Sequence, residues 1–332
     1  MSQLDFLALG DITTDDFIKL SDVRIDTGKH ESDEGLDEMC FRFGDKIEYD
    51  DHDVIPAVGN APNAGVSAHR LGLNAALRTN FGDDMVGKGN MEQLEKEGIN
   101  LDYVRMHEGK QSNYHYVLRH GAERTILVKH YDYDYKLPDF DQPPRFIYMS
   151  SVGENSFDHH MEIAEYVSNN ETKLAFQPGT FQMKMGYDKL QDLYEATHIY
   201  FSNKEEAQRV LETDETDMKV LLEKMHKCGP DIAVITDGRD GAYAFDGDTG
   251  WHMPMYPDPK PPVDRTGAGD AFSSTFTAAL AEGHDIPTAL RWGPVNSMGV
   301  VQEIGAQAGL FERSEFEKHL ANAPDDYEPE EI

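Results

Sequence analysis

A glycine-rich segment near the C-terminal end of this chain combines residue types that could bind a phosphate and remove a proton. It reads Asp-Arg-Thr-Gly-Ala-Gly-Asp over residues 264–270, and the apolar residues that follow at helical spacing predict a helix over 268–282. The unpaired N–H groups at a helix start attract an anion, and glycines let the backbone approach it closely. We therefore expect a phosphoryl group to meet the backbone of Gly267, Ala268 and Gly269.

The aspartate in the first turn of this helix is the candidate general base. Asp270 would stand beside the bound phosphoryl group, where a substrate hydroxyl could be deprotonated. An ordinary acidic first turn uses the same residue types, because a carboxylate also stabilises a helix N-terminus. The segment alone leaves both interpretations open.

Segment 264–270 and several other segments resemble the signatures of the ribokinase-like (PfkB) family of carbohydrate and nucleoside kinases, and they follow one another in the order typical of that family. Residues 58–66 read Val-Gly-Asn-Ala-Pro-Asn-Ala-Gly-Val and are similar to the first family signature, with Val58 in place of its first glycine. Residues 10–15 read Gly-Asp-Ile-Thr-Thr-Asp and are similar to the opening strand and turn of the family. The resemblance implies that the acceptor is bound by Asp15, Gly59 and Asn63.

Segments further downstream imply the nucleotide and metal sites of the same family. Residues 203–206, Asn-Lys-Glu-Glu, match the element that positions magnesium through water, which implies that Glu206 organises Mg²⁺. Residues 234–238, Val-Ile-Thr-Asp-Gly, resemble the strand end that lines the nucleotide phosphates. Asp264 is implied to help hold a monovalent cation such as K⁺. The residues implied to contact ATP are Asn203, Thr236, Gly238, Gly241 and Asn296.

The resemblance implies a kinase that moves the terminal phosphoryl group of ATP to a hydroxyl of a small sugar or sugar acid. A nucleoside is the second candidate acceptor, because the family includes both kinds of enzyme. A catalytically silent, ribokinase-shaped binding or regulatory protein is a candidate from another class. Degenerate proteins of that kind lose the base or the glycines, whereas Asp270, Gly267 and Gly269 are intact here. The sequence leaves the particular acceptor, and the choice of ATP, GTP or ADP as donor, open.

A second glycine-rich segment imitates a nucleotide-binding motif. Residues 82–89 read Gly-Asp-Asp-Met-Val-Gly-Lys-Gly and almost satisfy the Walker phosphate loop. Gly89 stands where that loop needs a serine or threonine for magnesium, and Asp83 and Asp84 would repel the phosphates. We expect Lys88 to be a surface helix residue.

The composition and net charge of the chain exclude some classes of binding partner. The 332 residues include 62 acidic and 30 basic ones, which gives a formal charge of −32 and argues against nucleic acid or an anionic membrane as a partner. A salt-rich cytosol and solubility alone both account for the acidic excess. No stretch approaches the roughly 20 apolar residues of a membrane span, and the first residues lack a basic signal region, so we expect a cytoplasmic protein. Cys40 and Cys228 are expected to be separate reduced thiols.

Short apolar runs alternate with helical segments, which predicts one α/β domain over residues 1–332. This rhythm is typical of a mostly parallel sheet covered by helices on both faces. The family resemblance implies that this is a ribokinase-like three-layer α/β/α fold. Ligands of such sheets bind at the carboxyl ends of strands, where we expect Asp15, Asn203 and Thr236. Among the expected strands are 6–9, 76–81, 146–149, 174–176, 198–201 and 232–235. Among the expected helices are 61–71, 88–97, 157–169, 204–211, 216–227 and 268–282.

Two stretches interrupt the rhythm and predict a small β lid. Residues 17–57 are polar and partly strand-like, and residues 111–129 indicate a hairpin that turns at 120–122. We expect them to cover the acceptor, with the acidic run 31–53 as a solvated flank and the lid as the contact of a homodimer. The acidic tail, 324–332, is expected to fray.

Overall fold

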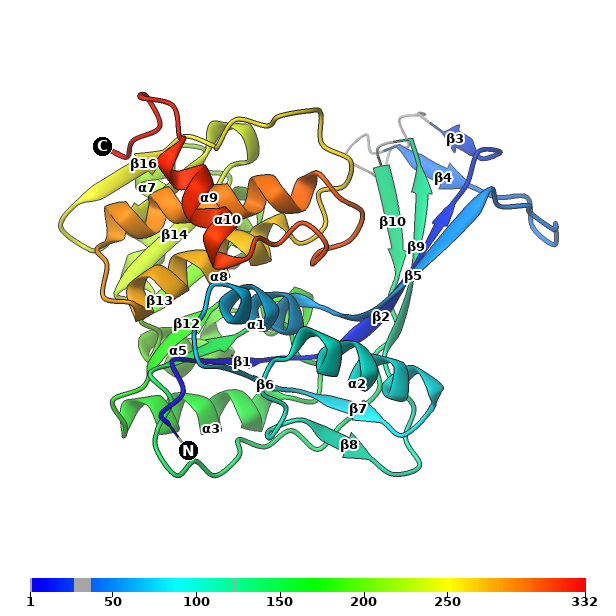
Figure 1. Ribbon diagram of the computed structural model, residues 1–332, viewed down its shortest axis with the longest axis horizontal. Coiled ribbons are helices and arrows are strands. Elements are labelled where there is room, and N and C mark those ends of the chain that lie inside the picture. Colours follow the sequence, from blue (N-terminus) through cyan, green and yellow to red (C-terminus); the bar gives the residue numbers. More distant parts are fainter. Residues whose placement is uncertain (1, 27–36, 122) are drawn as a thin grey trace.

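A nine-stranded sheet forms the centre of the protein (Figure 1). The computed structural model describes residues 2–26, 37–121 and 123–332. The strand order is β17-β16-β15-β14-β13-β12-β11-β1-β6. Neighbours from β14 to β6 pair in parallel, and β15, β16 and β17 add antiparallel strands at one edge. The strands are β1 (Phe6–Leu9), β6 (Ala75–Arg78), β11 (Phe146–Met149), β12 (Lys173–Phe176), β13 (Ile199–Asn203), β14 (Ile232–Thr236), β15 (Ala242–Phe245), β16 (Gly250–Met253) and β17 (Glu330–Glu331).

The parallel strands are apolar because helices cover both of their faces. Every residue of β1, β6 and β11 is buried. Side chains alternate along β1, so that Phe6 and Ala8 join one apolar cluster while Leu7 and Leu9 join the other.

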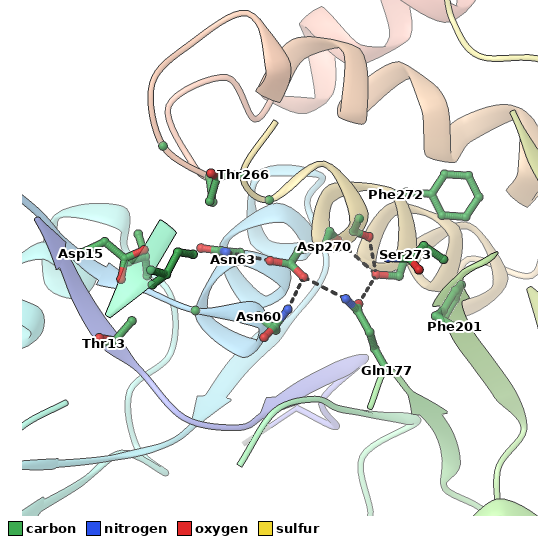
Figure 2. Close-up of a pocket in the computed structure, with 18 of the residues that line it drawn as sticks. Thr13, Asp15, Asn60, Asn63, Gln177, Phe201, Thr266, Asp270, Phe272 and Ser273 are labelled. Atoms are coloured by element: carbon green, nitrogen blue, oxygen red, sulfur yellow. Dashed lines mark hydrogen bonds between the residues drawn. The ribbon is translucent and has the colours of Figure 1, made fainter. Parts of the chain in front are cut away.

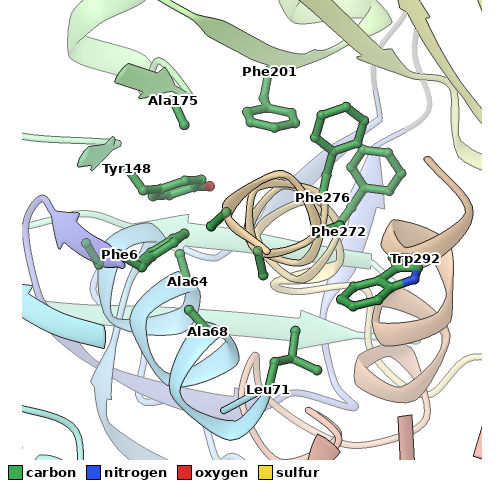
Figure 3. Packing of buried hydrophobic residues seen from close by; sticks show 14 of the residues in the cluster. Phe6, Ala64, Ala68, Leu71, Tyr148, Ala175, Phe201, Phe272, Phe276 and Trp292 are labelled. Carbon is green, nitrogen blue, oxygen red and sulfur yellow. The ribbon is translucent and has the colours of Figure 1, made fainter. Parts of the chain in front are cut away.

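Two helical layers contribute to these clusters and confirm the predicted three-layer α/β/α fold. Figure 3 shows Phe272 and Phe276 of one helix packed beside Phe201 of the sheet and Trp292 of the next helix. One layer contains α1 (Asn60–Arg70), α2 (Met85–Glu97), α8 (Ala268–Ala281), α9 (Ile286–Val301) and α10 (Arg313–Ala321). The other contains α3 (Phe157–Ser168), α4 (Thr180–Met185), α5 (Tyr187–Glu195), α6 (Lys204–Val210) and α7 (Met218–Lys227).

The lid is a four-stranded sheet that stands out from one side of the core (Figure 1). Its order is β10-β9-β2-β5, and the hairpin predicted within 111–129 forms β9 and β10. A smaller pair, β3 and β4, adjoins it. Residues 27–36 and Ala122, which belong to the predicted lid, lie outside the described residues. The strands are β2 (Thr13–Lys19), β3 (Arg24–Asp26), β4 (Glu38–Cys40), β5 (Asp51–Val58), β9 (Tyr114–His120) and β10 (Glu123–Leu127).

Two expectations about the core need correction. Asp15 does not follow a strand of the central sheet, because β1 ends at Leu9 and Asp15 lies inside lid strand β2. The apolar run 76–81 is not one strand: β6 ends at Arg78, and β7 (Asn80–Gly82) pairs with β8 (Arg105–His107) in a separate two-stranded sheet.

The C-terminal tail is ordered, so the prediction that it frays is wrong. The Tyr327 side chain is 2% exposed, packs against Tyr256, and donates a hydrogen bond to the Arg291 carbonyl. Beyond it, β17 adds to the sheet edge beside β16. One buried aromatic ring and a strand pairing outweigh the acidic composition of the segment.

Candidate active site

A cavity of about 390 Å³ lies between the lid and the core (Figure 2). Lid residues Asp15 and Phe17 line it from one side, and the start of α8, including Asp270, lines it from the other. A second cavity of about 220 Å³ continues from it, since Thr236 and Gly269 line both. The two cavities therefore meet where α8 begins.

Asp270 is a buried carboxylate that lines the first cavity, one residue beyond Gly269, and its side chain is held by three amides. Its Oδ1 accepts hydrogen bonds from Asn60 Nδ2 at 2.7 Å and Gln177 Nε2 at 3.0 Å, and its Oδ2 accepts one from Asn63 Nδ2 at 2.8 Å (Figure 2). Burial raises the pKa of Asp270, and the three hydrogen bonds oppose this rise by stabilising the charged form. The result is a buried carboxylate with a raised pKa and a fixed orientation.

Sequence reasoning missed two of these amides. Asn60 lies inside the segment identified as the first signature, and Gln177 directly follows the carboxyl end of β12. The amide of Gln177 is itself oriented: its Oε1 accepts hydrogen bonds from Tyr148 OH and from Ser273 Oγ, so its NH₂ group faces Asp270. Its position at a strand end was the available signal.

Of the two glycines before Asp270, Gly267 is required by its backbone geometry. Gly267 is the N-cap of α8 with φ 82°, and a Cβ there would lie 2.3 Å from Ala306 Cβ. Gly267 and Gly269 line the first cavity, and Ala268 and Gly269 line the second. The Ala268 N–H makes a long hydrogen bond, 3.4 Å, to the Arg265 carbonyl. Residues of the helix start thus line both cavities.

The three residues predicted to bind the acceptor, Asp15, Gly59 and Asn63, all line the first cavity. They differ in the contacts that they make with the rest of the protein. Asp15 is 8% exposed, and among the described residues its Oδ1 has no hydrogen-bond partner. Gly59 has φ 123°, and a Cβ there would lie 2.8 Å from the Asp11 carbonyl oxygen. The amide of Asn63 already donates to Asp270 and accepts from Gln307 Nε2 at 3.0 Å. Asn63 therefore holds the Asp270 carboxylate directly.

Asn203 and Glu206 line the cavity and also cap α6. The Asn203 side chain accepts from Glu206 N–H at 2.8 Å, and Glu206 Oε2 accepts from Asn203 N–H at 3.0 Å. Burial raises the pKa of Glu206, and the negative charge of Asp270 adds to this, so a nearby cation would be favoured. No group of three or more His, Cys, Asp or Glu side chains among the described residues could hold a metal directly. These residues fit a magnesium ion held through water.

The second cavity contains three of the five residues predicted to contact the nucleotide. Thr236, Gly238 and Gly241 line it, and Gly241 has φ 91° with Met253 O only 2.2 Å from where a Cβ would stand. Apolar walls are added by Tyr256, Pro294, Met298 and Val301, which the sequence did not indicate.

Asn296 is placed differently from its prediction. Its side chain is fully buried, donates to Ser67 Oγ and Thr275 Oγ1, and accepts from the Phe311 N–H. It lines neither of the two cavities. A buried amide whose donors and acceptor are all used ties α9 to its neighbours, so the expectation that Asn296 contacts ATP is not supported.

Asp264 fastens two loops together. Its Oδ1 accepts from Thr266 N–H and Oγ, and its Oδ2 accepts from Gly305 N–H at 3.1 Å. Burial acts to raise the pKa of Asp264, but these hydrogen bonds outweigh it and hold the pKa below its ordinary value. The carboxylate stays charged, which a monovalent cation nearby would need.

The Walker-like segment 82–89 is a capped helix start, as expected. Asp84 is the N-cap of α2 and accepts from Gly87 N–H at 2.8 Å, while Lys88 is exposed. None of its residues lines either of the two cavities.

Comparison with known proteins shows that the chain belongs to the pfkB family of carbohydrate kinases, whose sequence profile matches residues 40–313. The ribokinase of Bacillus subtilis is 28% identical over 271 residues, covering 79% of this chain and 87% of that one. A solved nucleoside kinase from Methanocaldococcus jannaschii superposes with a TM-score of 0.79 at 18% identity, covering 97% of this chain and 99% of that one. An Arabidopsis thaliana ribokinase complexed with ribose and ATP gives a TM-score of 0.78 at 19% identity, with 96% and 99% covered.

These likenesses confirm the predicted family and fold. The protein is a phosphotransferase of the family that contains ATP-dependent sugar and nucleoside kinases. Within the described residues, no helix is both long enough and apolar enough to cross a membrane.

Proposed function

We propose that this enzyme transfers the terminal phosphoryl group of ATP to a hydroxyl of a small sugar or sugar acid, with Asp270 as general base. The observation that carries the proposal is the position of Asp270, which is buried in the wall of the first cavity next to Gly269, a residue that lines both cavities, and is held by three amides. A phosphoryl donor in the second cavity and an alcohol in the first would place their reacting atoms at this carboxylate.

In this mechanism the protein supplies position and electrostatics. Asp270 takes the proton of the acceptor hydroxyl as the new bond to phosphorus forms. The backbone N–H groups of Gly267, Ala268 and Gly269, residues that line the two cavities, would stabilise the charge on the transferring group. Glu206 and Asn203 would hold Mg²⁺ through water, and that ion would neutralise phosphate charge. Asp264 remains the proposed neighbour of a K⁺ ion.

The acceptor is proposed from the first cavity. The unpartnered Oδ1 of Asp15 suits a hydroxyl donor, and the remaining N–H of the Asn63 amide suits a hydroxyl oxygen. Arg124 is the single Lys or Arg among the described residues that line this cavity, so a carboxylate on the acceptor would find one cation there. A nucleoside is the second candidate, favoured by Phe17 and Ile126 of the lid, which offer an apolar surface to a base.

Substrate screening of the purified protein with ATP tests this proposal. Sugars, sugar acids and nucleosides are compared by ADP release, with Asp270→Asn beside the parent. We expect release with a sugar or sugar acid and a fall of roughly 10²- to 10⁴-fold in the variant. Asp285→Asn is the matched control, because Asp285 caps α9, lines neither of the two described cavities, and can be replaced by asparagine, which caps a helix equally well.

Two outcomes would contradict the proposal. Binding of sugar and ATP without ADP release under any condition would favour the catalytically silent protein. Unchanged turnover in Asp270→Asn would remove that residue as the base.

We further propose that the outer face of the lid forms a homodimer contact. The face opposite the cavity carries Tyr116, Leu127 and Val54 in one cross-strand row through Asp16, and these three side chains are 46%, 50% and 49% exposed. Light scattering should give twice the monomer mass, and Tyr116→Lys should return the monomer mass. A monomeric parent protein would rule this contact out.

A further inference from the structure

The side chain of Gln307 lies on the far side of Asn63 from Asp270, and the proposed mechanism does not use it. Gln307 belongs to the segment between α9 and α10, and it is 7% exposed. Its Nε2 donates one hydrogen bond to Asn63 Oδ1, at 3.0 Å, and another to the Ala57 carbonyl, at 2.8 Å. Gln307 lines neither of the two described cavities, so it can act on the site only through the groups that it contacts.

The Ala57 carbonyl is held in place where lid strand β5 meets the core. Ala57 is buried and has φ 61°, and it is one of two residues other than glycine with a positive φ in the described part of the chain. Such a conformation persists only where the surrounding structure holds it. The Ala57 N–H donates to Asn90 Oδ1 at 2.8 Å, and the same oxygen accepts from Thr14 Oγ1 of lid strand β2 at 2.8 Å. Asn90 thus fixes both lid strands at their core ends, and Gln307 meets a carbonyl that cannot turn away.

The backbone of Gln307 is fixed as well. Arg70 of α1 donates to the carbonyls of Gln307 and Leu310, at 2.9 Å each. The Arg70 guanidinium is itself paired with Glu97 of α2 at 2.7 Å. The amide of Gln307 is therefore held by its backbone and by both of its acceptors.

The direction of each hydrogen bond in this row of amides follows from the two ends of the row. A backbone carbonyl and a charged carboxylate both accept hydrogen bonds and never donate them. The Ala57 carbonyl therefore requires the NH₂ group of Gln307, and this NH₂ group in turn requires the oxygen of the Asn63 amide. That leaves the Asn63 NH₂ group toward Asp270 Oδ2, which it contacts at 2.8 Å.

We propose that Gln307 is a positioning residue for the reaction, because it keeps the Asn63 amide turned toward Asp270 as a donor. This role rests on the proposed function of Asp270 as the base. A charged Asp270 needs a donor, whereas a protonated Asp270 would be stabilised better if Asn63 turned its oxygen toward the new hydroxyl. Gln307 opposes that turn, since it would set two NH₂ groups against each other. The protonated state is therefore disfavoured, and Asp270 stays charged to a lower pH.

The other charged and titratable groups near these side chains are not changed by a substitution at Gln307. Those around Asp270 lie on the lid, on α6 and on β11, and they are Asp15, His115, Arg124, Glu206 and Tyr148. Tyr148 stays neutral, because burial and the Asp270 charge raise its pKa. Those around Gln307 are Arg70, Glu97 and Glu312. A change in the titration of Asp270 in a neutral variant of Gln307 would therefore come through Asn63.

Carbon-13 NMR of the ligand-free protein, labelled in its aspartate carboxyl groups, tests the proposal without any need for activity. The Asp270 signal is assigned with Asp270→Asn. Gln307→Met has similar length but no donor, so the Asn63 amide is free to turn, and the proton affinity of Asp270 should rise about tenfold, the scale of one hydrogen bond.

Gln302→Met is the matched control for this measurement. Gln302 lies in the same segment and is 8% exposed, its Nε2 also donates to a carbonyl, that of Lys260, and it lines neither described cavity. The proton affinity of Asp270 should be the same in Gln302→Met as in the parent. An unchanged Asp270 titration in Gln307→Met, or an equal rise in both variants, would overturn the proposal.

The pH profile of kcat gives a second readout, with a variant that keeps the donors. The ammonium group of Gln307→Lys has three N–H groups and can serve both Ala57 and Asn63. We expect Gln307→Met to lose activity at low pH and to recover to within about twofold of the parent at high pH, whereas Gln307→Lys should keep its activity at low pH. Thermal unfolding measures the stability of each variant separately. An equal loss at every pH in both variants would show that Gln307 only supports the fold, and would also overturn the proposal.

The two readouts separate this inference from the proposed function. A raised proton affinity of Asp270 in Gln307→Met, in a protein that phosphorylates no sugar or nucleoside, would contradict the function and leave the positioning of Asn63 in place. An active kinase in which Asp270 titrates alike with and without the Gln307 amide would do the reverse.

Discussion

At the scale of single residues, the site is organised around keeping one buried carboxylate charged. Asp270 needs to be ionised to accept a proton, yet burial raises its pKa. Asn60, Asn63 and Gln177 each donate one hydrogen bond to it. Tyr148 and Ser273 fix the amide of Gln177, so a side chain that holds Asp270 is itself oriented by further side chains.

Removing one of these donors should therefore make the enzyme more sensitive to acid. In Gln177→Leu the carboxylate loses a donor, its pKa rises further, and kcat should fall at low pH while it recovers at high pH. We expect a loss of about tenfold near the acid end, the scale of one hydrogen bond to a charged group. The measurement is the pH profile of kcat. Gln93→Leu is the control, because Gln93 also donates to a carboxylate, that of Glu97, but outside the two cavities. A uniform loss at every pH would show that Gln177 does not act through the ionisation of Asp270.

At the scale of elements, the start of α8 is the feature that the rest of the fold positions. The helix is buried along most of its length between α1, α9 and the sheet, so its N-terminus cannot shift without disturbing the core. Gly267 permits both the positive φ and the close approach of Ala306.

Replacing Gly267 should sharply reduce turnover because the helix start moves, and this effect can be separated from the backbone strain that the new side chain also causes. Gly267→Ala adds a Cβ that clashes with Ala306 and forces the helix start to move, so we expect kcat to fall by at least 10²-fold, the scale of a lost anion-hole donor. Gly283→Ala is the control: its φ is 88°, and nothing lies within 4 Å of the added Cβ. Both variants should lose about 1 kcal/mol of stability through strain, measured by thermal unfolding, and Gly267→Ala more through its clash. Equal activity in the two variants would refute the role of the helix start.

The N-terminus of α6 should control the dependence on magnesium. In Glu206→Gln the side chain still offers an oxygen to the Asn203 N–H, so the cap is retained, but the charge that would organise the ion is lost. The Mg²⁺ concentration for half-maximal rate should rise about tenfold, with acceptor affinity unchanged. Glu205→Gln, one residue away and exposed, is the control. The same magnesium titration for Glu206→Gln as for the parent would speak against this assignment.

At the scale of the whole molecule, repulsion among the charges that give a net charge of −32 lowers the stability of the folded chain. Like charges repel one another over distances of about 10 Å in 0.1 M salt and about 3 Å in 1 M salt. Raising the KCl concentration from about 0.1 M to about 1 M should therefore increase Tm, by on the order of 5 °C. Equal stabilisation by NaCl would identify screening as the cause, whereas stabilisation by KCl alone would indicate a specific cation site such as the one proposed at Asp264. A fall in Tm with both salts would contradict the prediction.

Local patterns in the sequence were enough for the main elements of the fold. Strands buried on both faces must be short apolar runs, and helices between them must show helical spacing, so the layers could be predicted from periodicity. Helix α9 was not predicted, because Gly293 and Pro294 interrupt its helical pattern. Gly293 is nevertheless needed there, since a Cβ at this position would lie 2.5 Å from the Phe272 ring. The tail was misjudged because one aromatic ring, that of Tyr327, decides its order.

For the candidate site, the sequence by itself indicated residues that belong to recognisable motifs. These are Gly267, Gly269 and Asp270 at the start of α8, and Asn203 and Glu206 at the start of α6. Only the tertiary structure decided which side chains meet. It brought Asn60 and Gln177 to the base, placed Asn296 in the core, and joined His115 to His130 across the lid and the core. These contacts join residues distant in the chain, and a linear pattern carries no information about side chains that come together only when the sheets and helices pack.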